Sequence, residues 1–498
     1  MGSAQPRDDA ALVVSGARTD GASAPSGRWG ALVFIALAQL MIALDATIMN
    51  VALPSAQSAL RFTDADRQWV ITAYTLAFGG LLLLGGRIAD YAGRKRTFLI
   101  GLGGFAAASA VGGVADSLGM LIAARALQGA FGALLAPTVL ALLTILFVEP
   151  RERARAFAIF GGIAGGGGTV GLLLGGLLTE YLDWRWCLYV NVPVAIAAAL
   201  GGWLTLVDTR TGRRPRLDAL GALLASGALV AVVYGCAQTA AYGWGSAPVV
   251  GLLVAGVVLL GLFGLRESWV RDPLLPLRIL RDRNRAGAYL SVAFAVAGML
   301  ALFLFLTYYL QVVLAYTPLR AGLAFLPLSA AVLVSSQAIS GRLPRVRPRV
   351  LIVPGLLVAA AAMIMVSRLT VASEYVTSLL PAEIMLGLGM GCVFVPAMST
   401  ATQRVAPRDT GVAAAVVNTA QQVGGSIGVA SLNTIAAAAT AGYLSAHPLG
   451  PLTRTEGIVH GYTVAATWAA GILIAAALLA AVLINAPAQH SRSVEASS

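Results

Sequence analysis

An aspartate inside a long apolar run is the first residue of this sequence that could carry chemistry. The run begins near Trp29, and Asp45 lies within it, ahead of Pro54. A stretch of about 20 apolar residues spans a bilayer, and an ionisable side chain within such a stretch is costly and rare. We therefore interpret Asp45 as a functional residue that faces a protein interior or a water-filled path.

Arg125 is the second candidate, because it also lies inside an apolar run, soon after Leu118. At a rise of about 1.5 Å per residue, Asp45 and Arg125 both lie about 10–14 Å below the same membrane surface, so they could meet. Burial disfavours a charged carboxylate and a nearby guanidinium favours it. A movement of Arg125 relative to Asp45 would therefore load or release a proton. The alternative is a static ion pair that holds two helices together.

The composition places the chain among polytopic membrane proteins. Hydrophobic residues make up 58% of the 498 positions and charged residues 11%, whereas charged residues form about a quarter of a soluble domain. The formal net charge of +12 could indicate a nucleic-acid partner, but that requires a basic face or tract on a folded domain. The arginines fall instead in short clusters between apolar runs, so we expect a bilayer and no nucleic acid as partner.

The apolar runs predict an all-α protein with fourteen membrane spans. We expect a disordered tail at 1–28, a six-helix bundle at 29–208, a linker with two extra spans at 209–286, a second six-helix bundle at 287–486 and a tail at 487–498. Arginine-rich loops alternate with arginine-poor loops, which predicts that the former are cytoplasmic. With an even number of spans, both termini are expected in the cytoplasm.

Cysteine and histidine patterns predict no metal site and no cofactor. The three cysteines, Cys187, Cys236 and Cys392, are far apart and each lies in an apolar run. The three histidines form no ligand motif either. No GxxxxGK[ST] loop for ATP is present, so we expect an ion gradient, and not nucleotide hydrolysis, to drive any transport. No set of residues indicates an enzyme.

Several short motifs agree with this interpretation. Residues 86–96 match a loop pattern in which Gly86, Asp90, Gly93, Arg94 and Lys95 are the expected residues and Tyr91 replaces a base. This pattern resembles the loop signature of the major facilitator superfamily. Arg125 to Gly129 resembles the R-x-x-Q-G signature of its fourth helix, and residues 161–176 resemble its glycine-rich antiporter motif.

Further motifs are similar to those of the fourteen-helix drug:proton antiporters, the family of bacterial multidrug and antibiotic exporters. They are residues 44–54, the Asp183 to Trp186 segment running into Asn191-Val192-Pro193, and residues 411–428 with Asn418, Gln421 and Gln422. The resemblance covers the chain from Trp29 to Ile484. It implies a proton-coupled exporter of amphipathic or cationic drugs in the bacterial cell membrane. The alternatives are an exporter of an endogenous metabolite or siderophore, and a sensor that has lost transport.

The resemblance also implies roles for individual residues. Asp45 would bind the proton, and Arg125 would adjust the proton affinity of Asp45. Asp90 with Arg94 would latch the inner side closed, in the loop that holds Gly86, Gly93 and Lys95. Tyr91 leaves one expected charge of this inner gate missing, which favours the sensor alternative.

The glycine-rich segment contains a formal GxGxxG pattern, but the strand and helix that a dinucleotide site needs are missing. Small residues at helical spacing allow close helix packing in membranes, which predicts that Gly165, Gly171, Gly175 and Gly176 face another helix. Leu172 stands where the family pattern has proline, so we expect a straighter helix here.

Five polar residues are candidates for a substrate cavity: Gln128, Glu383, Asn418, Gln421 and Gln422. Glu383 could bind a cationic substrate or a second proton, or it could lie in the headgroup layer, since long polar side chains near helix ends snorkel. For the amides of residues 411–428, the alternative to lining a cavity is hydrogen bonding between helices.

Overall fold

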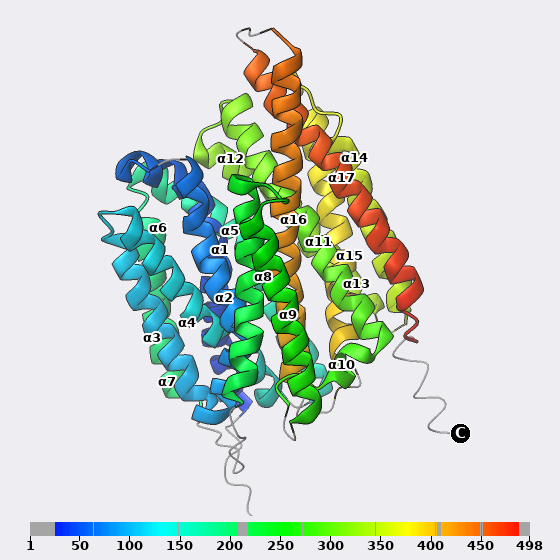
Figure 1. Ribbon diagram of the computed structural model, residues 1–498. Helices are drawn as coiled ribbons and strands as arrows, with labels where there is room; N and C mark the ends of the chain where they lie inside the picture. The colour runs from blue at the N-terminus through cyan, green and yellow to red at the C-terminus, as the bar shows by residue number, and fades with distance from the viewer. Residues whose placement is uncertain are drawn as a thin grey trace, which may run out of the picture.

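The computed structural model describes residues 25–487 apart from 63, 148, 208–217, 271–272, 344, 404, 406–409, 449 and 451. Within these ranges the secondary structure is helical throughout, with no strand. Figure 1 shows long helices that lie side by side and run between an upper and a lower end. The first helix begins, and the last one ends, at the lower end.

The N-terminal group packs around α1 and α4. The helix α1 contacts α5 and α7, α2 contacts α4, and α3 contacts α4 and α7. Their bounds are α1 Pro25–Leu60, α2 Asp64–Ala92, α3 Arg94–Gly113, α4 Leu118–Leu146, α5 Pro150–Tyr181, α6 Trp186–Tyr189 and α7 Asn191–Thr205. The start of α1 at Pro25 falls inside the tail predicted at 1–28, whose other residues are mostly outside the described ranges.

The C-terminal group packs around α15. This helix contacts α13, α14 and α11, while α16 and α17 pack on α11 and on each other. The bounds are α10 Leu277–Arg281, α11 Arg283–Tyr308, η1 Tyr309–Val313, α12 Pro318–Ala324, α13 Leu326–Arg342, α14 Pro348–Val366, η2 Tyr375–Leu379, α15 Leu380–Thr402, α16 Thr410–Ala446 and α17 Thr453–Leu483.

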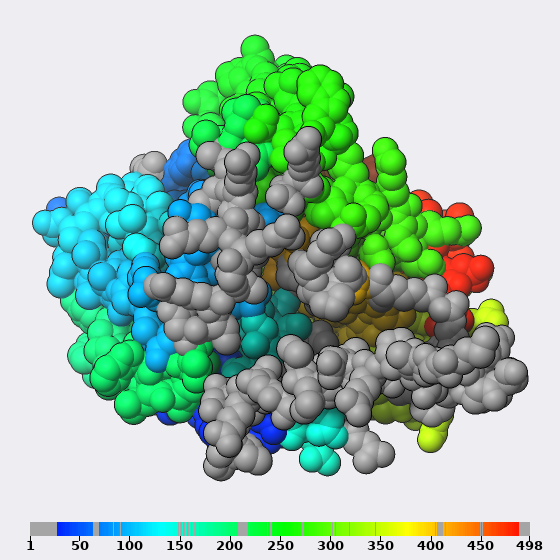
Figure 2. Space-filling model, turned by 90° about the horizontal axis from the view of Figure 1, so that it is seen from below, coloured from blue at the N-terminus to red at the C-terminus, as the bar shows by residue number. Residues whose placement is uncertain are grey.

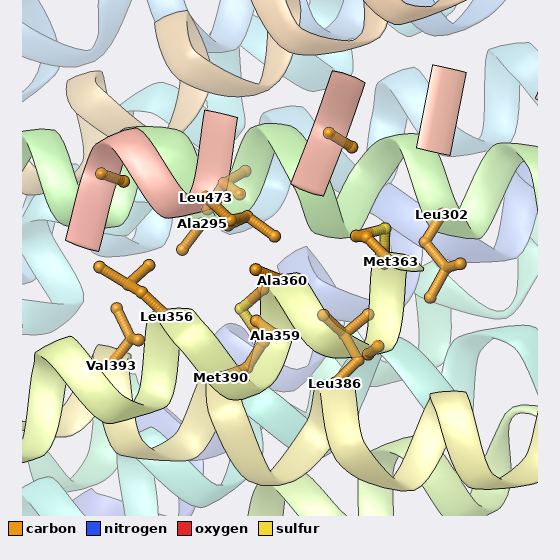
Figure 3. Close-up of a cluster of buried hydrophobic side chains, with 14 of the residues drawn as sticks. Ala295, Leu302, Leu356, Ala359, Ala360, Met363, Leu386, Met390, Val393 and Leu473 are labelled. Atoms are coloured by element: carbon orange, nitrogen blue, oxygen red, sulfur yellow. The ribbon is translucent and has the colours of Figure 1, made fainter. Parts of the chain in front are cut away.

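The interior of the C-terminal group is apolar over most of its length. Leu386 and Met390 of α15 lie against Ala360 and Met363 of α14, with Leu473 of α17 nearby (Figure 3). All five side chains are fully or almost fully buried. Burial of such side chains stabilises the group, and any polar group in it therefore stands out.

The helices α8 (Ala219–Tyr242) and α9 (Ala247–Trp269) lie between the two groups along the chain and also in space. α8 contacts α2 of the first group and α16 of the second, and α9 packs on the outside of α8. Seen from below, the green segment that includes both helices projects from one edge of the molecule (Figure 2). The two extra helices therefore bridge the groups on one side.

Polar contacts connect the lower ends of α8 and α9 to each other and to α2. The Asp218 carboxylate caps α8 by accepting from the Gly221 amide at 3.0 Å and pairs with Arg266 of α9 at 2.8 Å. The Arg87 guanidinium of α2 donates to the Pro273 carbonyl, in the segment that follows α9. These contacts tie the inserted pair to the N-terminal group.

Helix length and hydropathy identify the chain as a membrane protein. Within the described residues, ten helical segments are long and apolar enough to cross a bilayer, and the apolar stretches Trp69–Leu82 and Leu220–Cys236 are shorter. The all-α architecture is confirmed. The count of fourteen spans stays a prediction, as do the domain limits.

Candidate functional site

Asp45 and Arg125 form a buried ion pair between α1 and α4. Arg125 Nη1 lies 2.6 Å from Asp45 Oδ2, and the two side chains are 0% and 2% exposed. The two charges are removed from water, so each depends on the other for compensation. The structure thus brings together the two residues that were predicted to lie at the same depth in the membrane.

Amide groups complete the surroundings of the carboxylate. Asp45 Oδ1 accepts from Gln128 Nε2 at 3.0 Å and from Asn191 Nδ2 at 2.9 Å. Gln128 also accepts from Arg125 Nη1 at 3.0 Å and donates to Ser109 Oγ at 2.7 Å. Residues of α1, α3, α4 and α7 therefore form one buried network around a single carboxylate.

The helix α2 closes this network on the side of the guanidinium. Arg125 Nε donates to the Val70 carbonyl at 3.4 Å, and its Cζ lies 4.4 Å from the centre of the Tyr74 ring. A guanidinium over an aromatic face is favoured electrostatically. Close packing is possible because Gly129 has no side chain: a Cβ there would overlap the Tyr74 carbonyl oxygen.

Three members of the network were not predicted from the sequence as site residues. Ser109 and Tyr74 lie in apolar stretches without any charge, so nothing in the sequence distinguishes them from packing residues. Asn191 belongs to the Asn191-Val192-Pro193 motif at the start of an apolar run, and that motif is the signal that could have identified it.

The predicted cavity residues lie in three different places. Gln128 was expected in the substrate cavity, but its side chain is fully buried against Asp45. Asn418, Gln421 and Gln422 lie on α16 and are partly buried, and a Cβ on Gly79 of α2 would come within 3.4 Å of the Gln422 Cβ. Gln422 thus lies at the contact between the two groups.

Glu383 lies apart from the Asp45 network, within the C-terminal group near the start of α15. Its side chain is buried and 1% exposed. Tyr375 of η2 is its hydrogen-bond partner, at 3.2 Å. The carboxyl group is therefore covered by protein in this conformation.

The predicted inner gate lies between α2 and α3. Gly93 separates the two helices with a φ of 96°, a conformation that favours glycine. Lys95 donates to the Trp203 carbonyl of α7 at 2.6 Å, and Gly86 lies near Pro137 of α4. The side chain of Asp90 is outside the described part, so its pairing with Arg94 stays a prediction.

The glycine-rich helix α5 packs closely on α1 beside Asp45. A Cβ on Gly171 would overlap the Thr47 hydroxyl and lie 2.9 Å from the Leu44 carbonyl oxygen, and one on Gly175 would lie 2.9 Å from the Ile48 carbonyl oxygen. Thr47 donates to the Gly168 carbonyl at 2.9 Å. Gly176 is buried, and the side-chain environment of Gly165 is outside the described part.

We expect Gly171→Ala to lower the free energy of unfolding by about 1–3 kcal/mol, because the added methyl group overpacks the contact with α1. The measurement is thermal unfolding of the purified protein in detergent. Gly162→Ala is the matched control on the same helix, since a Cβ there meets no atom within 4 Å. Equal stability of the two variants would contradict the close α1–α5 contact.

No group of three or more His, Cys, Asp or Glu side chains that could hold a metal ion occurs in the described ranges. The Asp45 network instead contains a single carboxylate, held by one cation and two amides.

The profile of the Major Facilitator Superfamily matches residues 35–429. The chain belongs to this superfamily. Its members are transporters and not enzymes. The family expected from the motifs is therefore confirmed, over most of the chain.

Among curated relatives in the superfamily, the puromycin resistance protein pur8 of Streptomyces alboniger is 56% identical, over 92% of each chain. The cephamycin export protein CmcT of Amycolatopsis lactamdurans is 40% identical over 83% of this chain and 86% of its own. The tetracenomycin C resistance and export protein of Streptomyces glaucescens is 36% identical over 85% of this chain and 79% of its own.

Solved structures of the superfamily share the fold. The human organic anion transporter MFSD10 (TETRAN) aligns with a TM-score of 0.63 at 16% identity, over 92% of this chain and 100% of its own. A bacterial homolog of the human lysosomal transporter Spinster aligns with a TM-score of 0.63 at 17% identity, over 94% of this chain and 100% of its own. That structure is inward-facing and unoccupied. At these identities the likeness establishes the architecture alone.

Proposed function

We propose that this protein exports an antibiotic across the bacterial cell membrane in exchange for protons, with Asp45 as the proton carrier. The observation that carries the proposal is the buried ion pair of Asp45 with Arg125 of a neighbouring helix. Relatives whose names state resistance to, or export of, puromycin, cephamycin and tetracenomycin C support the substrate class. Puromycin is the first compound to test because the relative named for it is the most similar of the three.

Protonation of Asp45 would change the contact between α1 and α4. A neutral carboxyl group no longer attracts Arg125 as a charge, whereas Arg125 keeps the Gln128 oxygen, the Val70 carbonyl and the Tyr74 ring as partners. The guanidinium can thus stay with α2 and α4 while α1 is released. Coupling follows because the proton alters the helix contact and a movement of the helices alters the proton affinity.

Substrate would bind between the two groups, where Gln422 of α16 lies near Gly79 of α2. One group would then rock against the other to expose the site alternately to each side. We place the inner latch at Asp90 and Arg94, and both termini in the cytoplasm. The proton gradient is the energy source, and the protein needs no cofactor.

We expect puromycin to release protons from everted membrane vesicles that contain the protein. The vesicle lumen is first acidified, and a pH-sensitive dye reports the lumen after puromycin is added. The luminal pH should rise with the wild type and stay constant with Asp45→Asn. Gradient-independent uptake of puromycin would contradict proton coupling. A lack of response to every compound of an antibiotic panel would favour the alternative of a sensor without transport.

A further inference from the structure

We propose that Glu383 is a second proton-binding site, located in the C-terminal group, and that it holds a proton in the conformation described here. Its role in transport rests on the proposed antiport function. The site lies at the upper end of the molecule in Figure 1, where α12 and the start of α15 lie. Its other members are Tyr375 of η2 and the Ala324 carbonyl at the end of α12.

The contact with Tyr375 gives the Glu383 carboxyl group little compensation for its burial. The Tyr375 oxygen lies 2.6 Å from the Ala324 carbonyl oxygen and 3.2 Å from Glu383 Oε2. A tyrosine hydroxyl has one hydrogen, and a carbonyl oxygen can only accept. The shorter contact, to Ala324, therefore takes most of this hydrogen bond, and Glu383 Oε2 shares it at the longer distance. A buried carboxylate with one long, shared hydrogen bond is strongly disfavoured, which favours the protonated form.

The surroundings of the other carboxyl oxygen agree with a neutral acid. Glu383 Oε1 is buried and has no hydrogen-bond partner among the described residues. A buried carboxylate with a bare oxygen would be strongly disfavoured, whereas a neutral carboxyl group is tolerated at a much smaller cost. Asp45 differs in this respect, because Arg125 and two amides contact both of its oxygens.

The cationic side chain of the neighbouring helix α12 is directed elsewhere. Arg320 of α12 lies over the Tyr316 ring, 3.9 Å from its centre, and the Tyr316 and Tyr375 ring centres are 6.5 Å apart. Glu383 forms no ion pair within the described part of the chain. Glu374, just before η2, is exposed.

The helices packed against α15 carry their charged residues at the lower end of the molecule, away from Glu383. These charged groups are Arg283 and Arg285 of α11, Arg342 of α13 and Arg349 of α14, and α16 has none. Arg368 follows α14 at the upper end, and the tyrosines of the neighbouring elements are Tyr289, Tyr308, Tyr309 and Tyr443. Tyr309 donates to the carbonyls of Thr370 and Ser373 and not to Glu383.

The fold offers a route by which this proton could leave. Tyr375 lies on η2, a π-helical turn between α14 and α15, and such turns recur at functional sites. A shift of η2 away from α12 would break the contact with Ala324 and admit water to the carboxyl group. Charging of Glu383 would then accompany opening of the upper end, and a return to the packed state would require a proton.

Infrared difference spectroscopy of the purified full-length protein tests the protonation directly. We expect a carbonyl band of a protonated carboxyl group at neutral pH in the wild type and in Asp45→Asn, and its loss in Glu383→Gln. Glu374→Gln, which changes the exposed neighbouring acid, is the matched control and should keep the band. A band that persists in Glu383→Gln, or that is absent from the wild type, would overturn the proposal.

Tyr375→Phe keeps the test decisive even where the glutamine variant does not fold. It retains the acid but removes the hydroxyl that contacts it, so the carbonyl band should shift to higher frequency. An unshifted band would show that the protonated group is not Glu383 in contact with Tyr375, and it would overturn the proposal.

Proton counting in proteoliposomes tests the role in exchange. The ratio of protons to puromycin should fall to about half in Glu383→Gln, because one of the two proposed proton sites is lost. An unchanged ratio would remove Glu383 from the transport cycle. Proton-independent transport by the wild type would refute the antiport proposal instead, and the infrared result would still decide whether Glu383 is protonated.

Discussion

Arg125→Met should lower the free energy of unfolding by about 3–5 kcal/mol, because it leaves the Asp45 carboxylate buried without its cation. The two charged atoms are 2.6 Å apart and almost completely buried, so water cannot replace the lost partner. A proton can replace it, and the loss should therefore be largest in alkaline buffer and smaller in acidic buffer. Denaturant or thermal unfolding in mild detergent, at both pH values, gives the comparison.

The double variant Asp45→Asn with Arg125→Met should recover most of this loss, since no buried charge remains. Arg28→Met is a control at a second ion pair of the same group: Arg28 and Glu152 are 3.3 Å apart, but their side chains are 29% and 25% exposed. We expect that variant to lose no more than about 1 kcal/mol. Similar losses in Arg125→Met and Arg28→Met would contradict a buried, mutually dependent pair.

The pairing of Asp45 and Arg125 was predictable from the sequence, whereas most of their neighbours were not. Charges within apolar runs are conspicuous, and the rise of a helix fixes their depth in the membrane. The rotation of each helix about its axis is not fixed in this way. This rotation determines that Gln128 contacts Asp45 and does not face a cavity. It also brings Ser109 and Tyr74, which lie in apolar stretches, into the network.

The order of the helices was also easier to predict than their placement. Runs of apolar residues indicate where α8 and α9 lie along the chain, but only the packing shows that α8 contacts both α2 and α16. The wide turn at η2 has no sequence pattern of its own. Because Tyr375 lies on that turn, its contact with Glu383 could not be predicted from residue spacing.

Asp45→Asn should abolish uphill accumulation of puromycin while leaving binding and downhill exchange in place. Asparagine has nearly the shape of aspartate and can still accept from Arg125, but it cannot take up a proton. A pH difference of one unit is worth about 1.4 kcal/mol per coupled proton, or about tenfold accumulation. A gradient of about two units would therefore support about 100-fold accumulation for each proton exchanged, and none in the variant because we expect coupling to require Asp45.

Puromycin accumulation in proteoliposomes with an imposed pH gradient, with counterflow exchange measured in parallel, separates coupling from folding. Asp183→Asn is the matched control, because Asp183 lies in the segment between α5 and α6 and its side chain is 48% exposed; this variant should accumulate puromycin as the wild type does. If Asp45→Asn also accumulates it against the gradient, the proton is carried elsewhere. The buried pair would then serve only to hold α1 against α4, and Glu383, the buried acid at the start of α15, would be the next candidate for coupling transport to protons.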